Sequence, residues 1–306
     1  MIANQSLKTK SNKVKDSSGD RFFFACCYTV TILLAIIVLL PLIYVVACSF
    51  SSGIAVSSGK VLLWPVDFTL EGYKRVVVYP NIWRSYANTI LYTVGGTLLH
   101  ISMVMIAAYP LARRGLPHKK IFMLFFSFTM LFNGGMIPSY LLVRDLGIMN
   151  TIWAVLIPGA FSAYNMVVAR TFIQNSIPES LLEATQVDGC SDVRYFFQFV
   201  LPLSKAVIAV LSLQVAIGIW NSYFNAFLYL TNDKLYPLQL VLRKILLLSQ
   251  IGAEDLMDPD DSLALQGMAD LMKYSLIVFA TVPILCIYPF VQKYFVKGIM
   301  IGSLKG

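Results

Sequence analysis

The clearest pattern along the chain is an alternation of long charge-free segments with shorter polar ones. A charged side chain at the centre of a bilayer costs about 2.5–3.5 kcal/mol, so charge-free segments of about 20 residues predict transmembrane helices. At about 1.5 Å per residue, such a helix crosses a hydrocarbon core of about 30 Å. Six segments qualify: Phe22–Phe50, Ser85–Ala112, Ile121–Val143, Leu146–Ala169, Ala206–Asn232 and Tyr274–Gln292. The pattern predicts an all-α integral membrane protein with six transmembrane helices.

The composition agrees with this prediction. Of the 306 residues, 58% are hydrophobic and 13% are charged, whereas an ordinary soluble domain carries about 25% charged residues. A soluble enzyme and a disordered chain are therefore excluded. The five cysteines are too few for a disulfide framework and form no C-x-x-C pair, so we expect neither a disulfide nor a metal site.

The polar segments predict the orientation in the membrane. Lysine and arginine favour the cytoplasmic side, and the short turn Arg113–Lys120 is the case in which this rule is most reliable. The net charge of +8 then reflects the topology and anionic lipid, and nucleic acid is not an expected partner. The predicted parts are a cytoplasmic N-terminal tail (1–21), a six-helix transmembrane domain (22–292) with an inner loop (173–203) and an outer loop (233–272), and a cytoplasmic C-terminal tail (293–306).

The inner loop has the signals of two short helices joined by a turn. Ser176 and Glu179 have the spacing of a capping box at a helix start. Gly189 suits a left-handed helix end, and Ser191 can cap a second helix that stops before Pro202. We expect a helix-turn-helix at the cytoplasmic surface, a shape suited to docking into a groove of another protein. A polar connector whose glycine merely ends a helix is the alternative.

The same loop resembles the "EAA…G…LP" coupling loop in permease subunits of ATP-binding-cassette (ABC) importers. The matching residues are Glu183-Ala184-Thr185, Asp188-Gly189 and Leu201-Pro202, with Thr185 in place of the usual second alanine. The stretch Ile177–Leu181 resembles the maltose-type carbohydrate branch, and Gly134–Pro138 and Gly302–Gly306 resemble its complex-oligosaccharide subgroup. The resemblance implies the type I importer (MetI-like) permease fold and a location in the bacterial cell membrane.

The resemblance also implies a function without covalent chemistry in this chain. The loop residues expected to contact a separate ATPase are Glu183, Ala184, Asp188, Gly189, Arg194 and Pro202. The chain is then a translocation subunit that couples ATP hydrolysis on its partner to alternating access. Because it contains no G-x-x-x-x-G-K-[ST] motif, ATP and Mg²⁺ are expected on the partner. The expected partners are a second permease subunit that is a different chain, two ATPase subunits, an extracellular solute-binding protein, a carbohydrate and membrane lipid.

Polar residues within two predicted helices are candidates for the substrate path, because such residues face a bundle interior or a water-filled cavity. In the fifth helix, Gln214, Asn221 and Asn225 share one helical face with Gly218. The aromatic rings beside this face can stack on sugar rings. The full candidate set is Gln214, Asn221, Asn225, Trp220 and Tyr223 from the fifth helix with Ser162 and Asn165 from the fourth. The alternative is hydrogen bonding between helices, worth about 0.6 kcal/mol per contact.

Three other functions compete with this interpretation. An ion-coupled secondary transporter normally needs carboxylates inside the membrane or broken helices with matching repeats, and the six segments contain no Asp or Glu. A membrane-embedded enzyme lacks support because His100 and His118 are the only histidines and no H-E-x-x-H motif is present. An ABC permease for a solute other than a sugar is the third alternative.

Overall fold

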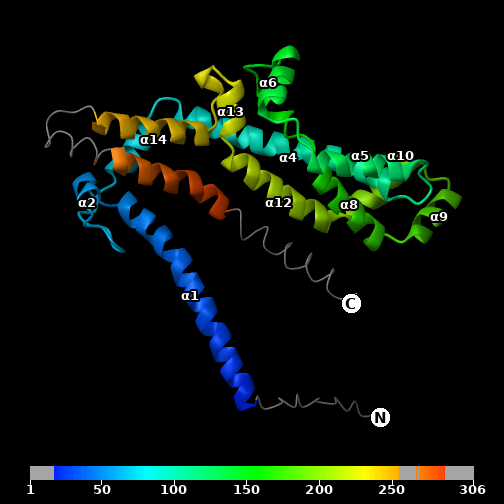
Figure 1. The fold of residues 1–306 in the computed structure, drawn as a ribbon, viewed down its shortest axis with the longest axis horizontal. Helices are drawn as coiled ribbons and strands as arrows, with labels where there is room; N and C mark the ends of the chain where they lie inside the picture. The colour runs from blue at the N-terminus through cyan, green and yellow to red at the C-terminus, as the bar shows by residue number, and fades with distance from the viewer. Residues whose placement is uncertain (1–16, 255–266, 268, 287–306) are drawn as a thin grey trace, which may run out of the picture.

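The computed structural model describes residues 17–254, 267 and 269–286, and every regular element within these residues is a helix (Figure 1). The longer helices are α1 (Ser18–Ser49), α4 (Ile82–Ala112), α5 (Lys119–Leu131), α6 (Met136–Asp145), α8 (Ala163–Ser176), α12 (Lys205–Asn221), α14 (Leu238–Glu254) and the helix Ala269–Cys286. The shorter α-helices are α2 (Gly53–Ser57), α3 (Glu71–Val78), α7 (Ile152–Leu156), α9 (Glu179–Val187), α10 (Asp192–Tyr195), α11 (Leu201–Leu203) and α13 (Phe224–Tyr229). The all-α prediction is confirmed.

The prediction of six membrane-spanning helices is not confirmed. Within the described residues, three single helices are long and apolar enough to span, namely Gly19–Ser49, Ile82–Ala112 and Ala269–Cys286. Counting two bent helix pairs as one span each gives up to five. The predicted C-terminal tail, the end of the sixth segment and the acidic part of the outer loop lie outside the described residues, as do the first 16 residues of the N-terminal tail.

The predicted third helix is divided into α5 and α6, which meet at an angle of 112°. The break lies at residues 132–135, where Gly135 has φ +87°, a backbone conformation that glycine adopts without steric cost. The Asn133 side-chain oxygen accepts the Gly135 N–H at 2.8 Å. This local bond competes with the helical ladder, so a charge-free segment does not form a continuous helix here.

The predicted fourth helix is also interrupted. Its described part consists of α7 and α8, separated by residues 157–162. Pro158 in this gap has no N–H for a helical hydrogen bond, and the Ser162 hydroxyl accepts the Asn165 N–H as the N-cap of α8. The fourth segment therefore starts its main helix at Ala163, near the end of the predicted span.

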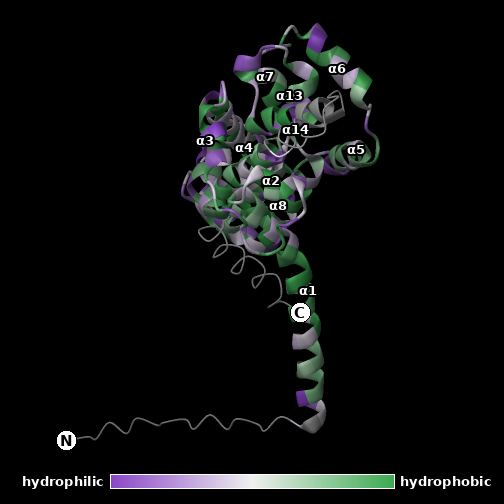
Figure 2. Cartoon of the chain, turned by 90° about the vertical axis from the view of Figure 1, so that its left-hand side faces the viewer, coloured by the Kyte–Doolittle hydropathy of each residue, from purple (hydrophilic) through white to green (hydrophobic). Residues whose placement is uncertain are grey.

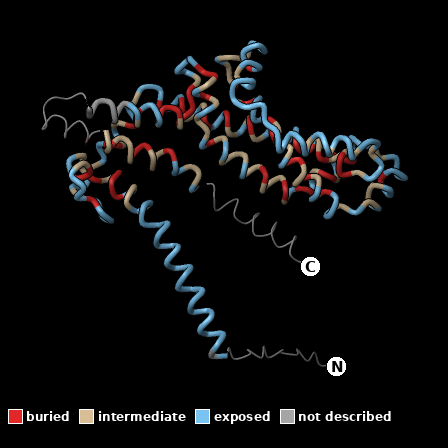
Figure 3. Tube along the Cα trace, viewed as in Figure 1, coloured by how far each residue is buried: buried red, intermediate tan, exposed pale blue. Residues whose placement is uncertain are grey.

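Helix α1 extends away from the other described helices (Figures 1 and 2). Its residues 19–43 are exposed, and burial begins only at its C-terminal end (Figure 3). There Ala47 and Cys48 pack with Ala55, Val56 and Val61 in a small separate core. A helix that is apolar on every side requires lipid or another protein around it, so the structure of α1 is that of a membrane helix.

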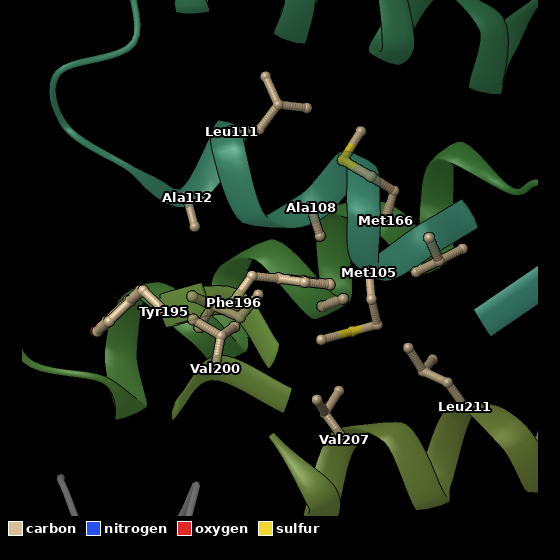
Figure 4. Packing of buried hydrophobic residues seen from close by; sticks show 13 residues of the cluster. Met105, Ala108, Leu111, Ala112, Met166, Tyr195, Phe196, Val200, Val207 and Leu211 are labelled. Atoms are coloured by element: carbon tan, nitrogen blue, oxygen red, sulfur yellow. The ribbon is translucent and has the colours of Figure 1, made fainter. Parts of the chain in front are cut away.

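The largest core lies where α4, α8 and α12 run beside one another and meet the inner loop (Figures 1 and 4). Its buried side chains come from all of these elements. They are Val104, Met105, Ala108, Leu111 and Ala112 of α4, Met166, Ala169 and Ile173 of α8, Tyr195, Phe196 and Val200 of the inner loop, and Val207 and Leu211 of α12. The inner loop is thus built on the same core as the apolar helices.

At the opposite end of α4, three side chains make hydrogen bonds to the backbone of residues 234–238, the segment that leads into α14. Asn88 Nδ2 donates to the carbonyls of residues 234 and 236, and the Tyr92 hydroxyl donates to the carbonyl of Leu235 at 2.8 Å. The Thr89 hydroxyl accepts the Leu238 N–H at 2.8 Å, and this bond is buried. Helix α14 lies within the predicted outer loop (233–272).

The Thr89 bond allows a matched stability test. Replacing Thr89 with Val leaves the buried Leu238 N–H without its acceptor, which lowers the free energy of unfolding by about 1–3 kcal/mol. The hydroxyl of Thr97, two turns along α4, is buried without a partner in the described part of the chain. We expect Thr89→Val to lower the thermal unfolding temperature of the purified protein and Thr97→Val not to lower it. Equal shifts for the two variants would contradict this role of Thr89.

Candidate functional site

The inner loop folds as a helix-turn-helix, as predicted. Helix α9 ends at Val187, and Gly189 follows with φ +77°, so the predicted left-handed helix end is confirmed. The predicted cap is confirmed as well, because the Ser191 hydroxyl accepts the Arg194 N–H at 3.3 Å at the start of α10. Capping chemistry acting over three or four residues therefore determines the turn.

The predicted start of the first loop helix was wrong. Ser176 is the last residue of α8, and Pro178 occupies the N-cap position of α9 without a side-chain capping bond. Helix α8 continues this far because Ile173 is buried in the main core and Gln174 Nε2 donates to the Ala112 carbonyl at 3.0 Å.

The predicted end of the second loop helix was also wrong. The helical path passes through Pro202 and ends at Leu203, after a π-helical turn at Phe196–Val200. A proline removes one hydrogen bond and its ring crowds the carbonyl four residues earlier, here that of Gln198, which lies in the π-helical turn. The wider turn accommodates the proline without ending the helix.

The predicted ATPase-contacting residues are concentrated at the tip of the loop. Glu183, Ala184, Asp188, Gly189 and Arg194 are exposed. Two apolar side chains beside them are exposed as well, Val187 at 89% and Val193 at 68%. Pro202 is exposed but lies in α11, at the far end of the second loop helix. The tip therefore exposes both charged and apolar side chains, and no other described part of the chain covers them.

Thr185, the departure from the family pattern, points inward. Its side chain is buried, and its hydroxyl donates to the Leu182 carbonyl at 2.8 Å. The Thr185 carbonyl accepts the Cys190 N–H at 2.9 Å. The threonine therefore contributes to closing the turn and leaves the exposed surface of α9 unchanged.

Ion pairs join both loop helices to the end of α4. Arg113 Nη1 lies 2.6 Å from Asp192 Oδ1 at the start of α10, and Arg114 Nε lies 2.8 Å from Glu179 Oε2 at the start of α9. Sequence analysis missed these pairs, because it used the basic residues of this turn only to predict the orientation. The sequence contained a signal for these pairs, because the turn after α4 is basic and the inner loop carries acidic residues at the starts of both its helices.

Side chains from α8 and α5 bind the last carbonyl groups of α4, which have no partner within their own helix. Arg170 Nε donates to the Leu111 carbonyl at 2.9 Å, and Lys119 Nζ donates to the Arg113 carbonyl at 2.9 Å. A cavity of about 430 Å³ remains between this end of α4, α8 and α9, and its lining includes Arg113, Arg114 and Glu179. Both loop helices line this cavity, with Leu182 from the first and Tyr195 from the second. The second loop helix contributes buried side chains to the main core, whereas Leu181 and Leu182 of the first are only partly buried against it.

The predicted polar face of the fifth helix is interrupted. Helix α12 ends at Asn221, and α13 begins at Phe224. Gln214 and Asn221 are exposed on α12, while Asn225 is half-buried on α13. Asn225 lines a small cavity of about 60 Å³. The prediction that Asn225 continues one helical face was wrong, because the chain leaves the helix at residues 222–223.

Two of the path candidates, Trp220 and Asn165, bond to another helix, and a third, Ser162, makes a local capping bond. Trp220 is buried, and its Nε1–H donates to the Ala280 carbonyl at 3.2 Å. Ser162 caps α8. Asn165 is buried with its Nδ2 at 2.9 Å from His100 Nε2, and the other ring nitrogen of His100 lies 2.8 Å from the Gly159 carbonyl. The bonds of Trp220 and Asn165 are of the interhelical kind that was the alternative to a path-lining role.

Tyr223 lies at the break between α12 and α13 and contacts Arg243 of α14. Arg243 Nη1 donates to the Tyr223 hydroxyl at 2.5 Å, and the guanidinium carbon lies 4.5 Å from the ring centroid. One face of this ring is therefore occupied by a cation. Sequence analysis did not select Arg243, although a charge among the apolar residues 238–247 was a signal for it.

These features define a helical membrane protein whose inner loop has an exposed tip and packs on the main core. Residues 103–301 match the family of binding-protein-dependent transport system inner membrane components, and because this match covers more than half of the chain, the chain belongs to that family. It is a transport permease subunit with the type I importer (MetI-like) fold.

Individual relatives cover nearly the whole chain. Protein LplC of Bacillus subtilis is 40% identical over 276 residues, which are 88% of this chain and 90% of LplC. The polygalacturonan/rhamnogalacturonan transport system permease protein YtcP of the same organism is 38% identical over 287 residues, 94% of this chain and 99% of YtcP. A solved chain from a bacterial ABC transporter that imports the acidic polysaccharide alginate superposes with a TM-score of 0.81 at 34% identity, covering 92% of this chain and all of that one.

The two ion pairs differ in exposure, which leads to a test. The Arg113 side chain is 27% exposed, whereas that of Arg114 is 86% exposed. Ion pairs at exposed positions contribute about 0.2–1 kcal/mol, and we expect the Arg113–Asp192 pair at the upper end of this range. In a double-mutant cycle that measures the free energy of unfolding, Arg113→Asp should lower this free energy, and adding Asp192→Arg should partly restore it. The corresponding exchange of Arg114 and Glu179 should restore less, and an equal or larger recovery there would contradict the assignment.

Proposed function

We propose that this chain is the translocation subunit of an ATP-driven, binding-protein-dependent importer of oligosaccharides. Membership of the inner-membrane component family supports the transport role. The sugar class is supported by the polysaccharides after which YtcP and the alginate importer are described, because this chain is similar to both over nearly its full length. The family favours this proposal over an ion-coupled carrier, and an ABC permease for another solute is the remaining alternative.

The observation that carries the proposal is the construction of the coupling loop (residues 173–203). Its tip exposes Glu183, Asp188 and Gly189, with Val187 89% exposed beside them. Its second helix is buried in the core that α4, α8 and α12 share. A protein that binds the tip therefore moves the helices together with the loop. This is the property required of a contact that passes conformational change from an ATPase to a permease.

The proposal includes the partners and the orientation. Two ATPase subunits bind ATP and Mg²⁺ on the cytoplasmic side, where the coupling loop docks, and a second, different permease subunit completes the path. An extracellular binding protein delivers the sugar to the opposite side. Both termini of this chain are cytoplasmic in a bacterial cell membrane. The basic turn at residues 113–120 beside the coupling loop supports this orientation, because short basic turns favour the cytoplasm.

The docking role predicts the effect of changes at the tip. Glu183→Lys reverses an exposed charge, and Gly189→Val places a β-branched residue at φ +77°, a conformation that such residues adopt only with strain. We expect both variants to lose most binding-protein-stimulated ATP hydrolysis and sugar uptake in reconstituted vesicles. Asp145→Lys is the control, because Asp145 is an exposed acid outside the loop. Wild-type activity in both tip variants would refute the docking role.

The exposed polar residues of α12 are proposed to line the substrate path. Asn221 is exposed, and its Nδ2 donates to the Ile217 carbonyl of its own helix, so its side-chain oxygen is available to a sugar hydroxyl. We expect Asn221→Ala to raise the KM for uptake while the complex assembles normally. Thr171→Ala, at an exposed position of α8, is the control. Unchanged uptake kinetics in Asn221→Ala would remove this residue from the path.

A further inference from the structure

Arg243 of α14 is an exposed cation without a carboxylate partner among the described residues. Of the eight other arginines, four lie within 3 Å of an Asp or Glu oxygen, namely Arg75, Arg113, Arg114 and Arg144, and the other four, like Arg243, have no such partner among the described residues. The side chain of Arg243 is exposed, and its hydrogen bond goes to the neutral hydroxyl of Tyr223. Its positive charge is therefore not neutralised in this part of the molecule.

Lys244, the next residue of α14, differs from Arg243 because it has a carboxylate partner. Lys244 Nζ lies 3.1 Å from Asp233 Oδ1 and 4.2 Å from the centroid of the Tyr236 ring. Burial alone lowers the pKa of the Lys244 ammonium, but the hydrogen bond and charge of Asp233, together with Tyr236, outweigh burial and raise that pKa above its usual value. The positive charge of Lys244 is thus matched by Asp233, whereas Arg243 has no acidic partner among the described residues.

Tyr223 holds the Arg243 guanidinium in one orientation. The guanidinium lies over the ring at 4.5 Å from its centroid and donates one N–H to the hydroxyl. A guanidinium has five N–H donors in a planar fork that matches a carboxylate. Stacking on an aromatic face preorganises that fork, so less freedom is lost when a carboxylate binds. The pair has the form of a prepared anion-binding group.

The position of the pair connects it to the proposed path. Helix α12 begins where the coupling loop ends and carries the exposed residues Gln214, Gly218 and Asn221 along its length. Tyr223 follows two residues after Asn221, beyond the end of α12. In Figure 1, α14 and the coupling loop helices lie at opposite ends of the molecule. Arg243 is therefore at the end of the polar face that is farthest from the docking site, which is the outer end in the proposed orientation.

We propose that Arg243, positioned by Tyr223, binds the carboxylate of a uronic acid unit when an acidic oligosaccharide enters the path. This inference rests on the proposed function and narrows its substrate class to anionic oligosaccharides. Tyr223 acts as a positioning residue, because the ring face occupied by Arg243 is not available for stacking on a sugar. The binding step involves hydrogen bonds and charge attraction only.

The test compares two substrates that differ in charge. The complete transporter, with its ATPases and binding protein, is reconstituted in vesicles. ATP-driven uptake is measured for galacturonate oligosaccharides and for their methyl esters, which have the same units without the negative charge. For each variant, kcat/KM for uptake of a substrate is divided by the wild-type value for the same substrate. Selection by the binding protein acts equally on wild type and variant and cancels in this ratio.

Arg243→Gln is expected to reduce kcat/KM for uptake of the charged oligosaccharide about tenfold, as for loss of a hydrogen bond to a charged group. Its ratio for the methyl ester should stay near one. Arg243→Lys keeps the charge without the fork, and Tyr223→Phe keeps the ring without the hydroxyl, so both should raise the KM for the charged substrate only. Lys234→Gln removes a nearby exposed cation and should leave both ratios near one, which separates a specific contact from general charge attraction.

Several results would overturn the inference. Equal losses for both substrates in Arg243→Gln would indicate a structural role, and an unchanged ratio for the charged substrate would exclude a contact. A loss in Lys234→Gln as large as that in Arg243→Gln would replace the site by general attraction. If Arg243 variants are normal while wild type imports the uronate and Glu183→Lys does not, the inference fails and the proposed function stands. If wild type shows no ATP-driven uptake of either substrate, the inference fails, and the proposed function fails with it only if oligosaccharides of neutral sugars are not imported either.

Discussion

The packing of Tyr195, Phe196 and Val200 against α4, α8 and α12 is the contact on which the rest of the described structure depends. It places the second helix of the coupling loop inside the same core as the apolar helices. Close-packed interiors transmit displacement because they have few voids. The first loop helix lies partly over a polar cavity, and exposed ion pairs contribute little energy. The second loop helix contributes buried side chains to this core and the first only partly buried ones, so the second is the more deeply packed connection between the tip and the membrane helices.

Helix α4 carries this contact along the molecule. Its C-terminal half packs against the coupling loop, and its N-terminal half binds the chain before α14 through Asn88, Thr89 and Tyr92. Near its middle, His100 bonds to Asn165 and to the Gly159 carbonyl. Unpaired backbone groups are costly in lipid, and Asn88 and His100 supply partners to the carbonyls of Tyr236 and Gly159, which lie outside the helices. Polar side chains in this apolar helix thus allow neighbouring segments to break.

Local chemistry explains which features could be predicted from the sequence. Charge exclusion identified the apolar segments, and capping rules identified Gly189 and Ser191, because these effects act within a few residues. The breaks at Gly135 and at residues 222–223 carry no charge, so the same rule treated them as continuous helix. Trp220 was assigned to the path because it lies beside a polar helical face, but its hydrogen-bond partner, the Ala280 carbonyl, is 60 residues away. Interactions over such sequence separations are not visible in spacing or composition.

The same reasoning applies to the two ends of α12, which sequence analysis treated as parts of one longer apolar segment. The helix begins after a 76° bend at buried Ser204, directly after the coupling loop, and its 17 residues extend for about 25 Å to Asn221. Its interior contains no proline, so it can move as a rigid rod. A rotation imposed at the bend by the coupling loop would reorient the face bearing Gln214 and Asn221 and shift the chain beside Arg243. One unbroken helix therefore connects the proposed docking site with the proposed anion-binding site. The breaks at Ser204 and at residues 222–223 free its two ends, so the helix can move relative to the segments on either side.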